Sequence, residues 1–264
     1  MTQLDLRGVT FTGADSQTSI HAMLEISRQY PWVEWGILAS HTTWQNAVSP
    51  RYPSSDWIAD LVRVAQQNVD TMHLALHLQG RWIRKLLAGV IEIQDYALPG
   101  FKRFQLNFHR STLDVDPAGF IAALRIFKHC DVIFQLDAID GNRYMSAAWQ
   151  DSSLHSQLFG LFDASGGAGL VPETWPAPLY ATSDPHTWIM HGYAGGLGPH
   201  NIAAELERIA VAASGIPIWI DMETHVRSRD DMEFDLDKVM AVIEIVEPYV
   251  VHHPNTRLPW DITA

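Results

Sequence analysis

The sequence predicts an α/β fold, namely a (β/α)8 barrel that occupies residues 1–264 as a single domain. Short apolar runs alternate with stretches of helical period along the chain, a pattern typical of parallel strands joined by crossover helices. The length of 264 residues fits one such barrel of about 250 residues. A doubly wound open sheet is the alternative, but no G-x-G-x-x-G motif follows the first apolar run.

Eight apolar runs are expected to form the strands. They are Gly8–Thr12, Val33–Ala39, Met72–Leu78, Arg103–Asn107, Val132–Asp137, Leu158–Asp163, Trp188–Gly192 and Pro217–Asp221. The segment Ile216–Ile220 is apolar at successive positions, which is typical of a strand that is buried on both faces. A parallel sheet covered by helices is therefore expected.

Five amphipathic segments are expected to form helices between these runs. They are Ile20–Ser27, Trp57–Val64, Phe120–Phe127, Ile202–Ala213 and Leu236–Ile245. Three of the helices are preceded by residues that suit a cap or a first-turn proline. These residues are Ser55-Asp56, Asp116-Pro117 and Pro199-His200-Asn201.

Composition excludes several classes of protein. Apolar residues make up 47% of the chain and charged residues 18%, unlike a disordered segment. The 18 Lys and Arg against 30 Asp and Glu argue against nucleic acid as a partner, because nucleic-acid binding needs clustered cations. The single Cys130 excludes a disulfide framework within the chain, and no apolar run is long enough for a membrane span. Met1–Gly13 does not have the pattern of a signal peptide, so a cytoplasmic location is expected. No cofactor is expected.

Polar residues gather at the carboxyl ends of the predicted strands, where barrels build their active sites. They are Thr10, Thr12, His77, Gln79, Gln105, Asn107, His109, Gln135, Asp137, Asp163, His191, Asp221 and Glu223. Some of them can simply cap loops and helices. His77 and His109 are candidate acid–base catalysts, because imidazole titrates near neutral pH. Candidate substrate ligands are Thr12, Gln105, Asn107 and Asp137.

Two glycine-rich segments follow the sixth and seventh predicted strands. The first contains Gly166, Gly167 and Gly169, and the second contains Gly195 and Gly196 just before a predicted helix. Glycines let backbone N–H groups approach an anion, and a helix N-terminus adds partial positive charge. The two segments together predict a phosphate site, although either one alone is compatible with a tight turn.

Several segments resemble the phosphoribosylanthranilate isomerase family in the same order and spacing. Asp163 precedes Gly-Gly-Ala-Gly, where the family has Gly-Gly-Thr-Gly. Ala194–Asn201 reads Ala-Gly-Gly-Leu-Gly-Pro-His-Asn, where the family has Ala-Gly-Gly-Leu-Asn-Pro-Glu-Asn. Asp221–Val226 lies at the family's Asp-Val-Ser-Ser-Gly-Val-Glu, and Ser49–Tyr52 looks like its Ser-Pro-Arg-Tyr segment. The matches cover the last hundred or so residues and this one earlier patch.

The resemblance implies roles for three residues. Asp163 falls on the family's general acid, which protonates the sugar ring oxygen as the furanose opens. Asp221 and Arg51 fall on positions that contact the substrate, and the planar fork of an arginine suits a carboxylate. The resemblance therefore implies isomerase-type chemistry on a phosphorylated sugar derivative.

Two positions depart from the family. Thr12 stands where the family has its cysteine base, and a threonine hydroxyl is far too weak a base near pH 7 unless a neighbour activates it. Cys130 cannot substitute, since it precedes the fifth strand at the opposite end of the barrel. His225 replaces a glycine, so it either crowds the phosphate or donates to it. Isomerisation of phosphoribosylanthranilate itself is the least expected of the family's properties.

Glu223 is a candidate for the missing base. It lies two residues after Asp221, so both side chains point to one face of an extended strand. Paired carboxylates tend to split their pKa values, which leaves one group protonated and the other ionised. We therefore expect an enzyme that transfers protons on a small, phosphorylated, sugar-like metabolite.

Two other functions stay open. One is a barrel that binds a phosphate ester without catalysis. The other is a metal-dependent hydrolase or lyase, whose mixed nitrogen and oxygen ligands would be His77, His109, Asp163, Glu223 and His225. No His-x-His or His-Glu-x-x-His spacing supports the metal, so no metal ligand is assigned. The oligomeric state also stays open.

Overall fold

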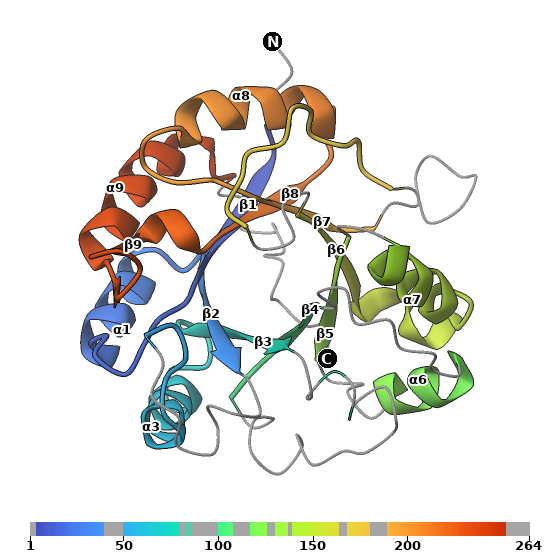
Figure 1. Ribbon diagram of the computed structural model, residues 1–264, viewed down its shortest axis with the longest axis horizontal. Coiled ribbons are helices and arrows are strands. Elements are labelled where there is room, and N and C mark those ends of the chain that lie inside the picture. Colours follow the sequence, from blue (N-terminus) through green and yellow to red (C-terminus); the bar gives the residue numbers. More distant parts are fainter. Residues whose placement is uncertain are drawn as a thin grey trace.

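Eight parallel strands close into a barrel in the computed structural model of the chain (Figure 1). The structure describes residues 4–39, 50–79, 83, 85, 100–107, 117–125, 130–136, 139–163, 168–179 and 189–251. The strands are β1 (Leu6–Thr12), β2 (Val33–Ala39), β3 (His73–Gln79), β4 (Arg103–Asn107), β5 (Asp131–Gln135), β6 (Leu158–Asp163), β7 (His191–Ala194) and β8 (Ile218–Met222). Each strand pairs with the next, and β8 returns to pair with β1. The predicted fold class is confirmed.

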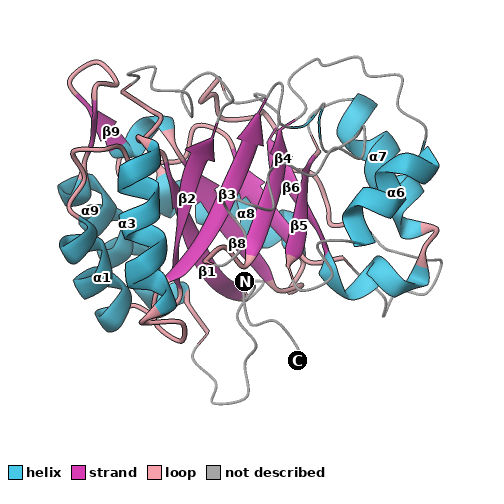
Figure 2. Cartoon of the chain, turned by 90° about the horizontal axis from the view of Figure 1, so that it is seen from below, coloured by secondary structure: helices cyan, strands magenta, loops and turns pink. Residues whose placement is uncertain are grey.

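Helices surround the barrel on its outside (Figures 1 and 2). They are α1 (Ile20–Gln29), α3 (Ser55–Gln66), α6 (Pro117–Leu124), α7 (Ile139–Trp149), α8 (Ile202–Ala213) and α9 (Leu236–Val246). Short 3-10 helices cover Ser152–Gln157, Thr224–Val226 and Glu247–Tyr249. A small antiparallel hairpin, β9 (Arg227–Ser228) with β10 (Glu233–Phe234), lies between β8 and α9. The sequence did not predict α7 or this hairpin.

The seventh strand lies further along the chain than predicted. The predicted run was Trp188–Gly192, whereas β7 runs from His191 to Ala194. Its register is fixed by pairing with β6, which places Ala194 opposite Asp163. Ala194 and the glycines after it are therefore brought level with the carboxyl end of β6.

Polar residues at two helix starts act differently from the prediction. The N-cap of α3 is Ser54, one residue before the predicted pair, and its side chain accepts from the Trp57 N–H. Asn201 precedes α8 but does not cap it with its side chain. Its side chain instead accepts from Gly198 N at 2.9 Å and donates to Gly196 O at 2.8 Å. Asn201 thus shapes the glycine loop that leads into the helix.

The barrel interior has an apolar side and a polar side. A compact cluster from β5 to β8 is separate from the main core, and it consists of Ile133, Phe159, Leu161, Ala194 and Trp219. On the opposite side, Arg103 and Glu34 form a fully buried ion pair with an N–O distance of 3.0 Å. The Arg103 guanidinium lies 4.5 Å from the Trp219 ring centroid and 5.0 Å from that of Phe159. This cation therefore joins the two sides of the interior.

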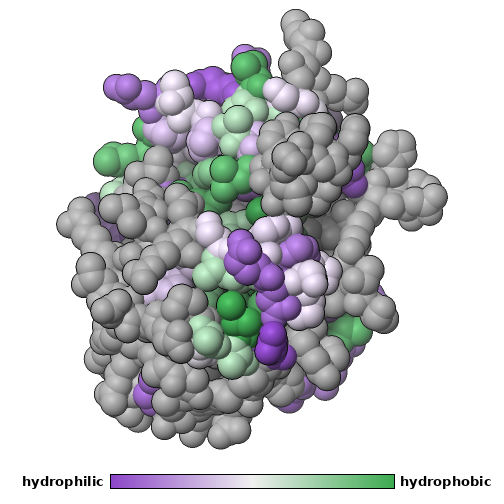
Figure 3. Space-filling model, turned by 90° about the vertical axis from the view of Figure 1, so that its right-hand side faces the viewer, coloured by the Kyte–Doolittle hydropathy of each residue, from purple (hydrophilic) through white to green (hydrophobic). Residues whose placement is uncertain are grey.

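Figure 3 shows one side of the molecule, on which the described residues form no large patch that is entirely hydrophobic or entirely hydrophilic. Hydrophilic and hydrophobic side chains are mixed over this side, which bears α6 and α7. None of the helices in the described part of the chain has the length and apolar character needed to cross a membrane.

Candidate active site

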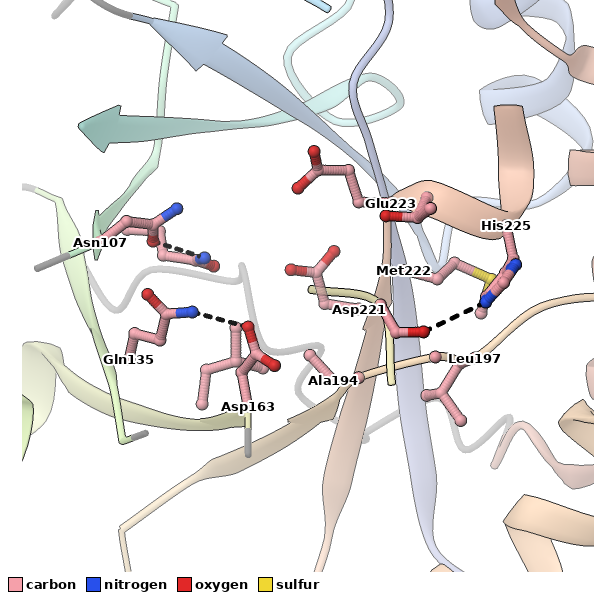
Figure 4. Close-up of a pocket in the computed structure, with 15 residues that line it drawn as sticks. Asn107, Gln135, Asp163, Ala194, Leu197, Asp221, Met222, Glu223 and His225 are labelled. Carbon is pink, nitrogen blue, oxygen red and sulfur yellow. Dashed lines mark hydrogen bonds between the residues drawn. The ribbon is translucent and has the colours of Figure 1, made fainter. Parts of the chain in front are cut away.

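A polar pocket opens at the carboxyl ends of the strands (Figure 4). Its empty space amounts to about 500 Å³ when the adjoining open solvent is included. Its lining comes from β4 to β8 and the loops that follow them: Gln105, Asn107, Gln135, Leu161, Asp163, Gly169, Ala194, Gly195, Gly196, Leu197, Asp221, Met222, Glu223, Thr224 and His225. The barrel thus places its pocket at the end where barrels commonly carry active sites.

Most of the predicted site residues that the structure describes line this pocket. They are Gln105, Asn107, Asp163, Gly169, Gly195, Gly196, Asp221, Glu223 and His225. Thr12, Arg51 and His77 are not among the lining residues, although Thr12 and Arg51 bond to residues that are. His109, Asp137, Gly166 and Gly167 lie outside the described residues.

Asp221 is a buried carboxyl group in the pocket wall, and Thr12 holds it. The Thr12 hydroxyl donates to Asp221 Oδ1 at 2.7 Å, across the seam where β1 meets β8. Burial raises the pKa of the Asp221 carboxyl to about 8, and the Thr12 hydrogen bond only partly opposes this. The negative charges of Glu223, Glu34 and Asp163 raise the pKa further. Asp221 is therefore mostly protonated at neutral pH, and the Thr12 hydroxyl orients a carboxyl group.

The raised pKa of Asp221 gives a pH-dependent prediction. An exposed aspartate in the unfolded chain has a pKa of about 3.9, so between about pH 4 and pH 8 the folded state holds a proton that the unfolded state has lost. The contribution of Asp221 to the free energy of unfolding therefore falls as pH rises through this window. Asp221→Asn removes this pH-dependent contribution. We therefore expect the free energy of unfolding of the variant, relative to that of wild type, to increase from pH 5 to pH 8. Urea unfolding at both pH values measures this, and parallel pH curves for the two proteins would contradict it.

Amide side chains support the opposite wall of the pocket. Gln135 Nε2 donates to Asp163 Oδ2 at 2.6 Å, which fixes the orientation of that carboxylate. Gln105 Nε2 donates to Asn107 Oδ1 at 2.8 Å. Figure 4 shows the carboxylates of Asp221 and Glu223 directed toward this wall. Carboxyl groups and amides therefore face each other across one space.

Two opposing effects act on the pKa of the Glu223 carboxyl group, namely burial and a neighbouring positive charge. Burial raises the pKa of its carboxyl group, and Arg51 opposes this through its charge and through a hydrogen bond from Nη1 to Oε1. Because Arg51 lies behind Glu223, the carboxylate can face the pocket while its charge is partly compensated from outside. A carboxyl group with a raised pKa is, in its ionised form, a stronger base than an ordinary carboxylate.

His77 is buried in the barrel interior, opposite the pocket-lining Gln105 in the register of β3 and β4, and it is not among the lining residues. Burial lowers the pKa of His77 to about 3, and the charge of Arg103 acts in the same direction, so the ring is neutral at pH 7. The inner wall leaves room for it because residue 36 is glycine: a Cβ there would lie 2.9 Å from His77 Nε2 and 2.1 Å from Thr12 Oγ1. His77 is thus placed as an interior packing residue and not at the pocket wall.

Glycines in left-handed conformations form the other end of the pocket. Gly169, Gly195 and Gly196 have φ values of 70°, 118° and 64°. His225 Nε2 lies 3.2 Å from the Gly169 carbonyl oxygen, and its ring contacts the His200 ring edge-to-face at 4.8 Å. The His225 side chain thus lies along the glycine loops, at the edge of the space that they leave.

Gly196 is the position in these loops where a side chain has no space. A Cβ there would lie 2.5 Å from Val171 N and 2.8 Å from Leu170 C, which are backbone atoms that cannot move independently. We expect Gly196→Ala to lower the free energy of unfolding by about 1–3 kcal/mol, measured by urea unfolding. Gly215→Ala is the matched control, because Gly215 has a φ of 82° with no atom within 4 Å of a Cβ. Equal losses in both variants would contradict a role for the close approach.

No metal centre is apparent in the part of the chain that the structure describes. No group of three or more His, Cys, Asp and Glu side chains there is placed to hold a metal ion. Of the five residues considered for this alternative, His77 is not among those that line the pocket, and His109 lies outside the described residues.

Two supporting residues were not predicted as part of the site. Gln135 was noted only as a polar strand-end residue, although its position on β5 beside the end of β6 was a usable signal. Asp231 lies in the β9–β10 hairpin and binds Arg51. No sequence signal marks that contact, because the partners are 180 residues apart.

Comparisons with known proteins find similarity only among solved structures. Neither a protein-family model nor a curated protein sequence matches the chain. Phosphoribosyl anthranilate isomerase from Thermococcus kodakaraensis shares 15% identity, covering 91% of this chain and 99% of the other, with a TM-score of 0.46. The citrate synthase SbnG shares 12% identity over 92% of this chain and 92% of its own, with a TM-score of 0.44. A GH113 beta-1,4-mannanase shares 13% identity over 94% of this chain and 99% of its own, with a TM-score of 0.41. The first of these carries the name of the family that the glycine motifs resemble.

Proposed function

We propose that this chain is an enzyme that transfers protons on a small, phosphorylated, sugar-like metabolite, in chemistry of the isomerase type. One observation carries the proposal. Three carboxyl groups, those of Asp163, Asp221 and Glu223, line a single pocket whose other end is built from glycines. Acid–base chemistry needs carboxyl groups of unequal proton affinity, and burial raises the pKa of both Asp221 and Glu223, whereas at Glu223 the charge of Arg51 opposes this effect.

The three carboxyl groups take different roles in this proposal. Asp163, oriented by Gln135, protonates the ring oxygen as the C1–O bond breaks, and the proton that leaves the anomeric hydroxyl restores the acid as C1 becomes an aldehyde. Glu223 then removes the proton from C2 of the open-chain sugar, exchanges it with solvent and delivers a proton to C1. A proton moves from the C2 hydroxyl to the C1 oxygen in the same step, so the aldose becomes a ketose with no net change in atoms or electrons. Asp221, which is protonated at neutral pH, donates a hydrogen bond to a substrate hydroxyl. Thr12 orients Asp221 and does not replace the family's cysteine as base.

The glycine end of the pocket is proposed to hold the phosphate. Gly169, Gly195 and Gly196 lack side chains at the pocket wall, so backbone groups can approach an anion closely. His225 lies beside them and can donate to a phosphate oxygen after turning from Gly169. Anchoring the phosphate at this end would place the sugar carbons among the carboxyl groups.

Deuterium exchange tests the proposal whatever product the enzyme forms. The purified protein is incubated in D2O with aldose phosphates such as ribose 5-phosphate, and proton NMR monitors the C2 signal. We expect loss of that signal for at least one sugar, because the base releases its proton to solvent. Binding of sugar phosphates with no exchange in any of them would instead identify a barrel that binds without catalysis.

Phosphoribosylanthranilate serves as a second probe. Thr12 stands where the family has its cysteine, so the protein lacks the family's thiolate base. The Thr12 hydroxyl bonds to Asp221 instead, and Thr12 is not among the residues that line the pocket. We expect phosphoribosylanthranilate fluorescence to decay at its uncatalysed rate in the presence of the protein. Faster decay that is lost in Asp163→Asn would show that the family reaction itself is retained.

A further inference from the structure

A chain of alternating charges leads from the pocket into the β9–β10 hairpin. Arg51 donates from Nη1 to Glu223 Oε1 and from Nε to Asp231 Oδ2. The other Asp231 oxygen, Oδ1, accepts from Arg227 Nε at 2.8 Å. Glu223 lines the pocket, whereas the other three residues lie behind it. The pocket carboxylate is thus the end member of a series Glu–Arg–Asp–Arg.

Arg227 anchors the far end of this series. Its side chain has no exposed surface, and it donates to the carbonyl oxygens of Gly13 and, at 2.6 Å, Pro50. It also lies 3.4 Å from Asp15 Oδ2, which accepts from Phe234 N in the hairpin at 3.0 Å. Arg227 therefore joins the loops after β1, β2 and β8, and it fixes the hairpin against the barrel.

The hairpin has an unfavourable backbone at the point where it presents Asp231. Arg229, Asp230 and Asp231 have φ values of 51°, 54° and 74°, three consecutive left-handed residues that are not glycine. Side chains with a Cβ disfavour this region, so the conformation persists only where other contacts hold it. Met232 N donates to Ser228 O at 3.1 Å and closes the turn. The turn directs the Asp231 carboxylate between the two arginines.

We propose that Arg51 and Asp231 are positioning residues that hold the Glu223 carboxylate at the pocket wall, and that the β9–β10 hairpin exists to present Asp231 to Arg51. This inference rests on the proposed role of Glu223 as the base. It replaces the expectation that Arg51 binds the substrate directly. Its Nε and Nη1 each already bind a carboxylate, and it is not among the residues that line the pocket.

Arg51 and Asp231 shift the pKa of Glu223 in opposite directions, which makes the proposal testable. Arg51 lowers the pKa of Glu223 against the effect of burial, whereas the charge of Asp231 raises it. If Asp231 were only a neighbouring charge, removing that charge would lower the titration midpoint of Glu223. If Asp231 anchors Arg51, its removal frees Arg51 from Glu223, and the midpoint rises.

Carboxyl NMR of the full chain, labelled with 13C in its glutamates and free of ligand, measures this midpoint. The Glu223 signal is assigned by its absence in Glu223→Gln. We expect Arg51→Met to raise the midpoint by about one pH unit, at the lower end of the range for loss of an adjacent charge because the pair is partly exposed. We expect Asp231→Asn to raise it as well, and Arg51→Lys to give a smaller rise than Arg51→Met. An unchanged midpoint in Arg51→Met, or a fall in Asp231→Asn, would overturn the proposal.

Two controls separate positioning from other roles. Arg63→Met removes an exposed ion pair with Asp60 on α3 and should leave the Glu223 midpoint unchanged. Calorimetry measures the dissociation constant of Arg51→Met for inorganic phosphate, which should stay within about twofold of the wild-type value. A tenfold weaker affinity would show that Arg51 contacts the ligand anion. The titration uses no substrate, so it can succeed even where no sugar undergoes deuterium exchange, and the two proposals fail separately.

Discussion

Asp163→Asn is expected to slow deuterium exchange into the substrate by about 10²–10⁴-fold, the usual contribution of a positioned general acid or base. The amide has the same shape as the carboxyl group and can still meet Gln135, but it cannot deliver a proton to the ring oxygen. The measurement is the initial rate of exchange at saturating sugar phosphate, where differences in binding do not contribute.

Asp221→Asn is the matched comparison within the same pocket. Burial keeps Asp221 protonated at neutral pH, and an asparagine reproduces a neutral group that donates a hydrogen bond. Its amide oxygen can also accept from Thr12. We therefore expect a much smaller loss of rate than in Asp163→Asn, within about tenfold of wild type.

A surface substitution completes the comparison. Asp60→Asn changes an exposed carboxylate on α3 and should leave the exchange rate unaltered. If Asp221→Asn lost more activity than Asp163→Asn, the assignment of the acid would move to Asp221. If both variants exchanged as fast as wild type, the pocket would not be the active site for this reaction.

The barrel could be predicted from the sequence because its strands are buried on both faces. All seven residues of β2 are buried, so that strand appears as an apolar run that only Glu34 interrupts and that ends at Ala39. The prediction was weaker where apolarity continued beyond the strand, as it does before β7 at Ile189 and Met190. The helix α7 was missed because its first turns contain Asp140, Gly141 and Asn142, which are typical of turns.

The carboxyl groups of the pocket could be predicted because position at a strand end determines where a side chain points. Their partners could not, since each comes from a distant part of the chain. Thr12 meets Asp221 across 209 positions, because the barrel closes only when β8 returns to β1. Arg51 meets Glu223 across 172 positions. Spacing therefore identified the chemical groups but not the residues that orient them and set their charge.

Arg103→Met is expected to lower the free energy of unfolding by about 3–5 kcal/mol, the loss that follows when one partner of a buried ion pair is removed. Glu34 and Arg103 are both fully buried, and Thr10 adds a hydrogen bond to Glu34 at 2.8 Å. Urea unfolding at neutral pH measures the loss. The exposed pair on α3 is the control, and Arg63→Met should change stability by less than about 1 kcal/mol.

A double variant separates the value of the pair from the penalty of breaking it. Burial already raises the pKa of Glu34, and Arg103 opposes this, so removing Arg103 raises the pKa further. The loss in Arg103→Met should therefore grow as pH rises, because keeping Glu34 protonated then becomes less favourable. Combining Arg103→Met with Glu34→Leu removes the unpaired carboxylate, and we expect the double variant to be more stable than Arg103→Met alone and to lose this pH dependence. If it were no more stable, contacts of the Arg103 guanidinium with Trp219 and Phe159 would account for the loss instead.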